Sequence, residues 1–146
     1  SGKWKGRKLS FPSAAGLRPS LGRVRETLFN WLRAEVADRR CLDLYAGSGA
    51  LGFEALSRGA AEVTFVDQDP KVIKALQANA ARLNAEGCII VRSSARRFLA
   101  RAVEPWDIVF LDPPFAEGDL VPTLDALRQK SLISRGGLVY FEASRR

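Results

Sequence analysis

The fold is decided by the stretch Cys41-Leu42-Asp43-Leu44-Tyr45-Ala46-Gly47-Ser48-Gly49-Ala50-Leu51-Gly52. Residues 41–45 are mostly apolar and predict a buried strand. Gly47 and Gly49 follow at once, and glycine allows both a tight turn and the close approach of a ligand to the backbone. Residues 51–58 then have the pattern of a helix, whose first N–H groups would lie beside that ligand. This glycine spacing matches dinucleotide-binding folds, but it does not choose between a nicotinamide and an adenosine cofactor.

The rest of the chain repeats this alternation of strand and helix. The predicted strands cover residues 41–45, 62–66, 88–91, 107–111 and 138–141. The predicted helices cover residues 51–58, 70–83, 95–101 and about 120–127. Gly136-Gly137 is interpreted as a break before the last strand. The pattern predicts an α/β fold with a doubly wound, mostly parallel sheet, that is, a Rossmann-like sandwich whose ligands bind beyond the carboxyl ends of the strands.

The positive charge is concentrated near the N-terminus. The net charge is +7, and residues 1–40 hold ten of the 23 Lys and Arg residues but only three of the 16 acids. A local basic block points to a polyanionic partner, although a solvated basic tail is the alternative. Ser20 is a candidate cap for a helix that runs to about Glu35. We therefore expect a basic, RNA-facing extension over residues 1–36 and a cofactor-binding catalytic domain over residues 37–146, together forming one structural unit.

The composition excludes several kinds of chemistry. The sequence has no histidine, which rules out Ser-His-Asp and Cys-His centres and His-ligated metals. Cys41 and Cys88 both begin predicted strands and are interpreted as reduced core thiols, and no metal site is expected. There is no apolar run of 18 residues and no signal-peptide pattern, so a cytoplasmic protein is expected. The chemistry must therefore use carboxylates, backbone groups and a cofactor.

Two carboxylates flank the glycine turn. A carboxylate at Asp43, four residues before Gly47, would repel a pyrophosphate but suits a ligand with an ammonium or sulfonium group. Asp67 ends the second strand, where an acid can accept both hydroxyls of a ribose. Each has a structural alternative: Asp43 would bond to N–H groups of the turn, and Asp67 would cap a turn. Asp67 thus supports a nucleoside cofactor without identifying it.

The segment Asp112-Pro113-Pro114-Phe115 directly follows the fourth predicted strand. The two prolines fix the backbone, so their carbonyls and the Asp112 carboxylate form a rigid cluster of acceptors. Phe115 adds a flat face for stacking. This set suits a planar heterocycle that carries an amino group. The alternative is a rigid loop with a capping Asp and a packed Phe, but the glycine turn and Asp67 on the same sheet favour a site.

These segments resemble the motifs of class I amino-methyltransferases, and the N-terminal block narrows the resemblance. Its three parts are Gly6-Arg7-Lys8-Leu9, Gly16-Leu17-Arg18-Pro19-Ser20 and Arg23-Val24-Arg25-Glu26-Thr27-Leu28-Phe29-Asn30-Trp31-Leu32. With them, nearly the whole chain resembles the bacterial 16S ribosomal RNA guanine-N2 methyltransferase family (the RsmD-like group).

The resemblance implies an S-adenosylmethionine-dependent enzyme that methylates a guanine N2 of small-subunit ribosomal RNA, acts on the assembled or assembling subunit, and works as a monomer. The implied catalytic residues are Asp112, Pro113, Pro114 and Phe115. The implied cofactor-binding residues are Asp43, Tyr45, Ala46, Gly47, Ser48, Gly49, Asp67, Gln68, Ser94 and Ala95. The residues expected to bind RNA phosphates are Lys3, Lys5, Arg7, Lys8, Arg18, Arg23 and Arg25.

Two features depart from the family pattern. Family members usually continue beyond the fifth strand with two more strands that form an antiparallel edge, whereas this sequence ends at Arg146. Many class I enzymes place an acid after the third strand to hold the adenine amine, whereas Ser93-Ser94-Ala95 stand here. We therefore expect that contact to come from a hydroxyl or a backbone group, with Ser94 as the candidate.

Three other functions are weighed against this one. A D-P-P-aromatic loop also suits an adenine-N6 methyltransferase that acts on DNA. A non-catalytic RNA-binding or ribosome-assembly factor with a vestigial cofactor site is a second alternative, although the intact segment 112–115 speaks against it. A nicotinamide dehydrogenase is the third, and it would lack an obvious proton-transfer residue because the chain has no histidine.

Overall fold

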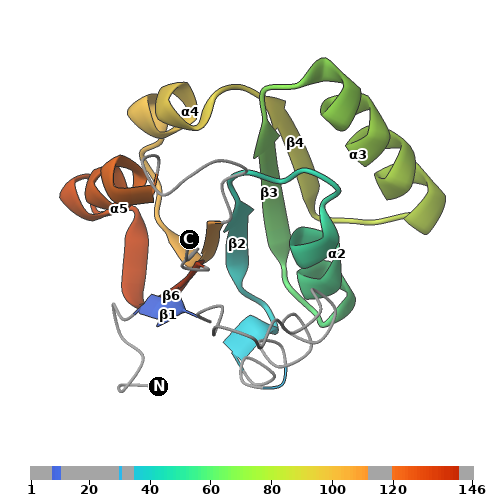
Figure 1. Ribbon diagram of the computed structural model, residues 1–146. Coiled ribbons are helices and arrows are strands. Elements are labelled where there is room, and N and C mark those ends of the chain that lie inside the picture. The colour runs from blue at the N-terminus through green and yellow to red at the C-terminus, as the bar shows by residue number, and fades with distance from the viewer. Residues whose placement is uncertain (1–7, 11–29, 31–34, 112–119, 142–146) are drawn as a thin grey trace, which may run out of the picture.

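A computed structural model of the chain describes residues 8–10, 30, 35–111 and 120–141. These residues form a parallel six-stranded sheet in the order β1-β6-β5-β2-β3-β4 (Figure 1). The strands are β1 (Lys8–Ser10), β2 (Arg40–Asp43), β3 (Glu62–Asp67), β4 (Cys88–Arg92), β5 (Trp106–Leu111) and β6 (Ile133–Phe141). The helices are α2 (Ala50–Ser57), α3 (Pro70–Leu83), α4 (Ala95–Arg101) and α5 (Leu120–Gln129).

The order of the strands reverses next to β2. From β2, the strands β3 and β4 extend the sheet to one side, whereas β5 and β6 extend it to the other. The switch point therefore lies between β2 and β5, and doubly wound folds bind their ligands beyond the carboxyl ends of the strands at such a point. The structure confirms the predicted doubly wound α/β sandwich.

Two apolar layers hold the helices against the sheet. α2 and α3 cover one face, where Leu76 is fully buried, and α4 and α5 cover the other, where Leu99 is buried (Figure 1). Successive residues of a strand point to opposite faces, so Ile108 of β5 packs in the first layer and Val109 in the second. Because both faces are covered, the strands are almost continuously apolar, as the sequence pattern suggested.

The last strand is longer than predicted. β6 begins at Ile133 and runs through Gly136-Gly137, so the interpretation of these glycines as a break was wrong. Gly136 has a φ of +80°, and the pairing with β5 changes register between Trp106 and Ile108. A Cβ at Gly137 would lie 2.8 Å from the Asp107 carbonyl oxygen. The glycines therefore carry an irregular part of the strand instead of ending it.

The N-terminal region also contributes a strand that the sequence analysis did not predict. β1 pairs in parallel with the last residues of β6, with Lys8 opposite Val139 and Ser10 opposite Phe141. A strand of three residues carries too little periodicity to be recognised beside a basic segment. β1 is thus the edge strand of the sheet, next to β6.

Both cysteines are free thiols, but only Cys41 lies in the core. Burial, together with the nearby Asp107 and Asp43 carboxylates, raises the pKa of Cys41 to about 12. Cys88 begins β4, an edge strand, and is half-buried, and burial also raises the pKa of its thiol. The prediction of two core thiols is confirmed for Cys41, whereas Cys88 packs against the core but is only half-buried, since β4 is an edge strand.

Within the described ranges, no helix combines the length and apolarity that crossing a membrane requires. In the same ranges, no three His, Cys, Asp or Glu side chains are grouped so as to hold a metal ion.

We expect Cys88 alone to react with a thiol reagent such as dithionitrobenzoate at about pH 8, because the reactive species is the thiolate. A pKa of about 12 leaves Cys41 almost wholly protonated until the protein unfolds. The absorbance of the released chromophore, with and without denaturant, measures both thiols. A Cys88→Ser variant is the control, and rapid reaction of that variant in the native state would contradict the assignment.

Candidate active site

The glycines of the turn after β2 differ in their surroundings. Gly47 has a φ of +54°, and a Cβ there would meet no atom within 4 Å. Gly49 has a φ of +80° and is the N-cap of α2, but a Cβ there would lie 2.6 Å from Leu76 Cδ2. Gly52 packs against the ring of Phe65 and brings α2 close to the sheet. Only Gly47 therefore borders open space, where a ligand can approach the backbone.

Asp67, at the carboxyl end of β3, fastens this turn. Its Oδ2 accepts a hydrogen bond from the Gly47 N–H at 3.0 Å, and its Oδ1 accepts one from the Asp69 N–H at 3.0 Å. The turn-capping alternative is thus present in the structure. A carboxylate offers about four lone-pair sites, so two such contacts leave room for a ligand. The half-buried carboxylate is held in one orientation beside the open space at Gly47.

Asp43 acts as a cap for α2 from within β2. Gly49, at the N-cap of this helix, has no side chain, and Asp43 Oδ2 accepts from the N–H of Gly52 at 3.1 Å. Asp43 is only 3% exposed. The structural alternative for Asp43 is therefore observed, since an acceptor is needed at the start of a helix. Its contact with an ammonium group stays a prediction.

Ser94 caps the next helix at the same edge of the sheet. Its Oγ accepts from the N–H of Arg97 at 3.2 Å, and the preceding Ser93 N–H donates to the carbonyl of Asp67 at 3.0 Å. The end of β4 is thereby tied to the end of β3. Capping leaves the hydroxyl proton of Ser94 and one lone pair available, so the expected contact with an adenine is chemically compatible with the cap.

A cleft of about 650 Å³ lies between α4 and α5 at this edge. Ligand pockets typically measure roughly 300–1,000 Å³. The predicted cofactor-binding residues that line it are Tyr45, Gln68, Ser94 and Ala95. The lining residues that the sequence analysis did not single out are Arg96, Leu99, Ala100, Pro122, Thr123, Ala126 and Lys130. The structure therefore brings residues that follow β2, β3 and β4 to one cavity.

Two of the residues that sequence analysis missed hold the walls of this cleft together. The hydroxyl groups of Tyr45 and Thr123 lie 3.0 Å apart, which joins the residue after β2 to α5. Lys130 Nζ donates to the carbonyls of Leu99 and Ala100 at 2.7 and 2.8 Å, at the end of α4. Thr123 fits an ordinary helical pattern and Lys130 follows directly after α5 as an ordinary polar residue, so neither gave a signal in the sequence.

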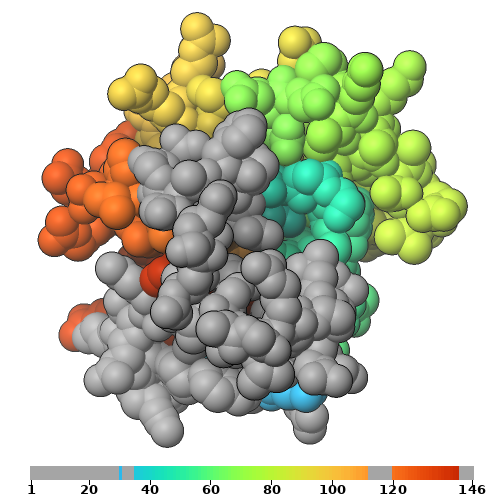
Figure 2. Space-filling model, in the orientation of Figure 1, coloured from blue at the N-terminus to red at the C-terminus, as the bar shows by residue number. Residues whose placement is uncertain are grey.

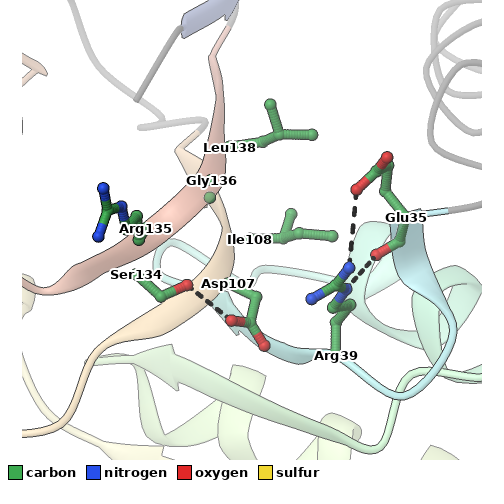
Figure 3. A pocket seen from close by; sticks show the side chains of 9 residues that line it. Glu35, Arg39, Asp107, Ile108, Ser134, Arg135, Gly136 and Leu138 are labelled. Atoms are coloured by element: carbon green, nitrogen blue, oxygen red, sulfur yellow. Dashed lines mark hydrogen bonds and ion pairs between the residues drawn. The ribbon is translucent and has the colours of Figure 1, made fainter. Parts of the chain in front are cut away.

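At the opposite, amino edge of the sheet, a water-sized cavity of about 10 Å³ lies beside β5 and β6 (Figure 3). There Asp107 accepts from the Ser134 hydroxyl at 2.6 Å, and Arg39 bonds to Glu35 (Figure 3). Asp107 also accepts from the Arg40 N–H at 2.8 Å. These polar groups satisfy one another, as buried polar groups normally do. Among the described residues, a second hollow of about 450 Å³ lies between the end of α3 and the start of β4, but none of the predicted cofactor-binding residues lines it.

β5 brings the chain to this carboxyl edge at Leu111, beside β2. The predicted catalytic residues Asp112, Pro113, Pro114 and Phe115 lie outside the described residues, so their part in the site stays a prediction. The same holds for the predicted RNA-binding residues Lys3, Lys5, Arg7, Arg18, Arg23 and Arg25. Lys8 begins β1, and its contact with RNA is likewise untested.

A glycine turn and a strand-end acid at the switch point of a parallel sheet define the class of doubly wound α/β proteins that bind a nucleoside cofactor. Residues 1–146 match the model of the family described as Conserved hypothetical protein 95. The chain belongs to this family, which contains the ribosomal RNA small subunit methyltransferases D.

Two relatives and one solved structure illustrate the membership. Ribosomal RNA small subunit methyltransferase D of Escherichia coli (strain K12) is 48% identical over 142 residues, which cover 97% of this chain and 72% of the relative. The enzyme of the same name from Haemophilus influenzae is 40% identical, with 99% of this chain and 77% of the relative covered. The solved structure of Escherichia coli yhhF is 47% identical with a TM-score of 0.80, and covers 85% of this chain and 70% of its own.

We expect Asp43→Ala to lower the free energy of unfolding by about 1–2 kcal/mol, because it removes the acceptor of a helix-capping hydrogen bond. Asp43→Asn keeps an acceptor oxygen for the Gly52 N–H and should retain most of that stability. Denaturant titration of both variants measures the difference. Equal loss in the two variants would show that the cap depends on the charge of Asp43 and not on its oxygen.

Proposed function

We propose that this chain transfers a methyl group from S-adenosylmethionine to the exocyclic N2 amine of a guanine in small-subunit ribosomal RNA. The observation that carries the proposal is the 3.0 Å hydrogen bond from the Gly47 N–H to Asp67, which joins the open glycine turn to a ribose-type acid. The name shared by the relatives supports ribosomal RNA as the substrate. The guanine N2 target rests on the resemblance of the N-terminal block and of residues 112–115.

The open space and the hydrogen-bond acceptors at the carboxyl edge fit this cofactor. Gly47 borders open space, and Asp67 beside it retains acceptor sites for two ribose hydroxyls. Asp43 would face the ammonium end, directly or through water. When bound, the cofactor supplies a methyl group already activated by its positively charged sulfur. The residues that would line its methionine part are Ala46, Gly47, Ser48 and Gly49, and those that would line its adenine are Tyr45, Gln68, Ser94 and Ala95.

The segment after β5 would hold the base. The Asp112 carboxylate and the Pro113 carbonyl accept hydrogen bonds from the guanine N2, and Pro114 keeps the backbone rigid. Phe115 stacks on the base, which is either flipped out or already unpaired. These contacts turn the amine lone pair towards the methyl donor, so positioning supplies much of the rate gain. A strong base is not required, because the methylated, cationic amine is itself acidic and can release its proton to the Asp112 carboxylate or to water.

The basic N-terminal region would position the RNA. Its Lys and Arg side chains contact phosphates, which orient the substrate without reading its sequence. The partner is the small-subunit ribosomal RNA or the assembling small subunit, and the enzyme acts as a cytoplasmic monomer.

Adenine-N6 methylation of DNA is the nearest alternative, because the same acceptor cluster suits any exocyclic amine. The experiment that separates the two is incubation of the protein with labelled S-adenosylmethionine and unmodified small subunits, free 16S ribosomal RNA or DNA, followed by analysis of the labelled base. We expect label on N2 of a guanine in the RNA. Label on adenine N6 in DNA would overturn the proposal, and absence of cofactor binding by calorimetry would favour a non-catalytic RNA-binding factor.

Asp112→Ala is expected to abolish methyl transfer while the affinity for the cofactor stays close to the wild-type value, since Asp112 holds the base and not the cofactor. Turnover with unmodified subunits and calorimetry with S-adenosylhomocysteine measure the two effects. Asp125→Ala is the matched control, because it removes a carboxylate of α5 that pairs with Arg128 at 3.3 Å. Near-normal turnover by Asp112→Ala would refute its assigned role.

Replacing Lys3, Lys5 and Arg7 together by Gln should weaken RNA binding and flatten its salt dependence. Each lost phosphate contact on a single strand lowers the slope of log affinity against log salt by about 0.7, so we expect a decrease of about 2. Filter binding at several salt concentrations measures the slope. The matched control replaces Lys74, Arg82 and Arg135, which are exposed on α3 and β6. An equal slope for both triple variants would count against the N-terminal surface.

A further inference from the structure

A second concentration of positive charge surrounds α4. Residues 41–146 contain equal numbers of basic and acidic residues, yet residues 87–103 contain four arginines and no acid. We name Arg92, Arg96, Arg97 and Arg101 the α4 arginine cluster. A charge count over residues 41–146 does not reveal this cluster, because the segment as a whole is balanced.

The cluster is exposed and unpaired. All four residues are exposed, and none of the four side chains makes a hydrogen bond or ion pair with another residue of the described ranges. Several other arginines of the fold are engaged, although Arg135 of β6 is not: Arg40 pairs with Glu62 at 3.3 Å, and Arg58 pairs with Glu54 at 2.9 Å. Ion pairing within the protein therefore does not account for the α4 arginine cluster.

The packing of α4 points part of the cluster outwards. Leu99 is buried in the core, and Arg97 and Arg101 lie two residues before and after it, which places them on the opposite side of a helix of 3.6 residues per turn. Being four residues apart, they are neighbours on one face. Together they form a ridge that solvent, or a partner, can reach.

Local stability does not favour this arrangement. The first turn of a helix is stabilised by acidic side chains, but α4 has none there and carries Arg96 and Arg97 instead. A cation there is unfavourable, because the first turn is the positive end of the helix dipole. Arg101 lies in the last turn, where a cation is favourable, so helix stability accounts for Arg101 but not for Arg96 and Arg97, which are better explained by a partner that meets their side chains.

The position of α4 connects the cluster to the candidate active site. α4 follows directly after the carboxyl end of β4, and Ser94, Ala95 and Arg96 line the cleft between α4 and α5. Figure 1 shows α4 at the carboxyl edge of the sheet, next to α5, and Figure 2 shows side chains of this yellow segment projecting from the surface. A polymer whose base enters at the switch point would have to pass near this surface.

We infer that the α4 arginine cluster binds phosphates of the same RNA whose guanine is methylated, as a second contact besides the N-terminal region. The inference rests on the proposed function. A guanidinium group suits this role because its planar donors bind a phosphate with two hydrogen bonds. The RNA would then contact cationic side chains from two separate parts of the sequence.

The test compares two pairs of substitutions with the same change of charge. Arg97→Gln with Arg101→Gln alters the ridge and leaves Arg96, which lines the cleft, unchanged. Arg82→Gln with Arg135→Gln is the control, and both of its residues are exposed on α3 and β6. Binding of an unmodified, protein-free 16S ribosomal RNA transcript is measured at several salt concentrations, and calorimetry with S-adenosylhomocysteine checks the cofactor site.

For the double variant Arg97→Gln/Arg101→Gln, we expect the slope of log affinity against log salt to become shallower by about 1.4. Its binding should weaken on the order of tenfold near 0.1 M salt, whereas the control variant keeps the wild-type slope. Cofactor affinity should be the same in all three proteins. If the α4 pair binds the transcript like the control while the wild-type protein methylates ribosomal RNA, the inference is wrong and the proposed function stands.

Two other results have equally clear meanings. A loss seen only with assembled subunits, and not with the transcript, would assign the cluster to an acidic ribosomal protein and overturn the RNA contact. A wild-type protein that neither binds nor methylates transcript or subunits would remove the proposed function itself, and this inference with it.

Discussion

The hydrogen bond between the Gly47 N–H and the Asp67 carboxylate is the constraint on which the site depends. It joins the turn that follows β2 to the end of β3, and the Ser93 N–H continues the connection to the end of β4. Three strand ends are thereby fixed at one edge of the sheet. The parallel order of the strands makes this possible, because it brings all their carboxyl ends to the same side.

Asp67 and Asp43 each accept a structural hydrogen bond at this edge, and Asp67 also keeps room for a contact with a ligand. Asp67 holds the turn and keeps acceptor sites beside the open space at Gly47, whereas Asp43 is buried and caps α2. A preformed arrangement of this kind lowers the entropy that a ligand must lose to bind in one orientation. The chain belongs to the family of the ribosomal RNA small subunit methyltransferases D, and in the proposed function this edge carries the chemistry while the two cationic regions bind the RNA.

Much of the fold follows from the sequence, because buried parallel strands and amphipathic helices have distinct periodicities. The limits of α4, for example, agree with the prediction. The predictions that failed concern features that depend on tertiary contacts. β1 is a strand because it pairs with β6. Gly136-Gly137 continues a strand because the backbone of β5 approaches it closely. At the site, spacing identified the glycines and Asp67. Thr123 and Lys130 could not be identified, because their roles appear only once α5 lies beside Tyr45 and α4.

A crystal structure of this chain with S-adenosylhomocysteine tests the central claim most directly. The account predicts ribose hydroxyls on the Asp67 carboxylate, the amino acid part beside Gly47, and the Asp112 carboxylate facing the sulfur across a gap that admits one flat base. A ligand bound away from Gly47, or an Asp112 side chain that is buried or turned from the sulfur, would contradict it.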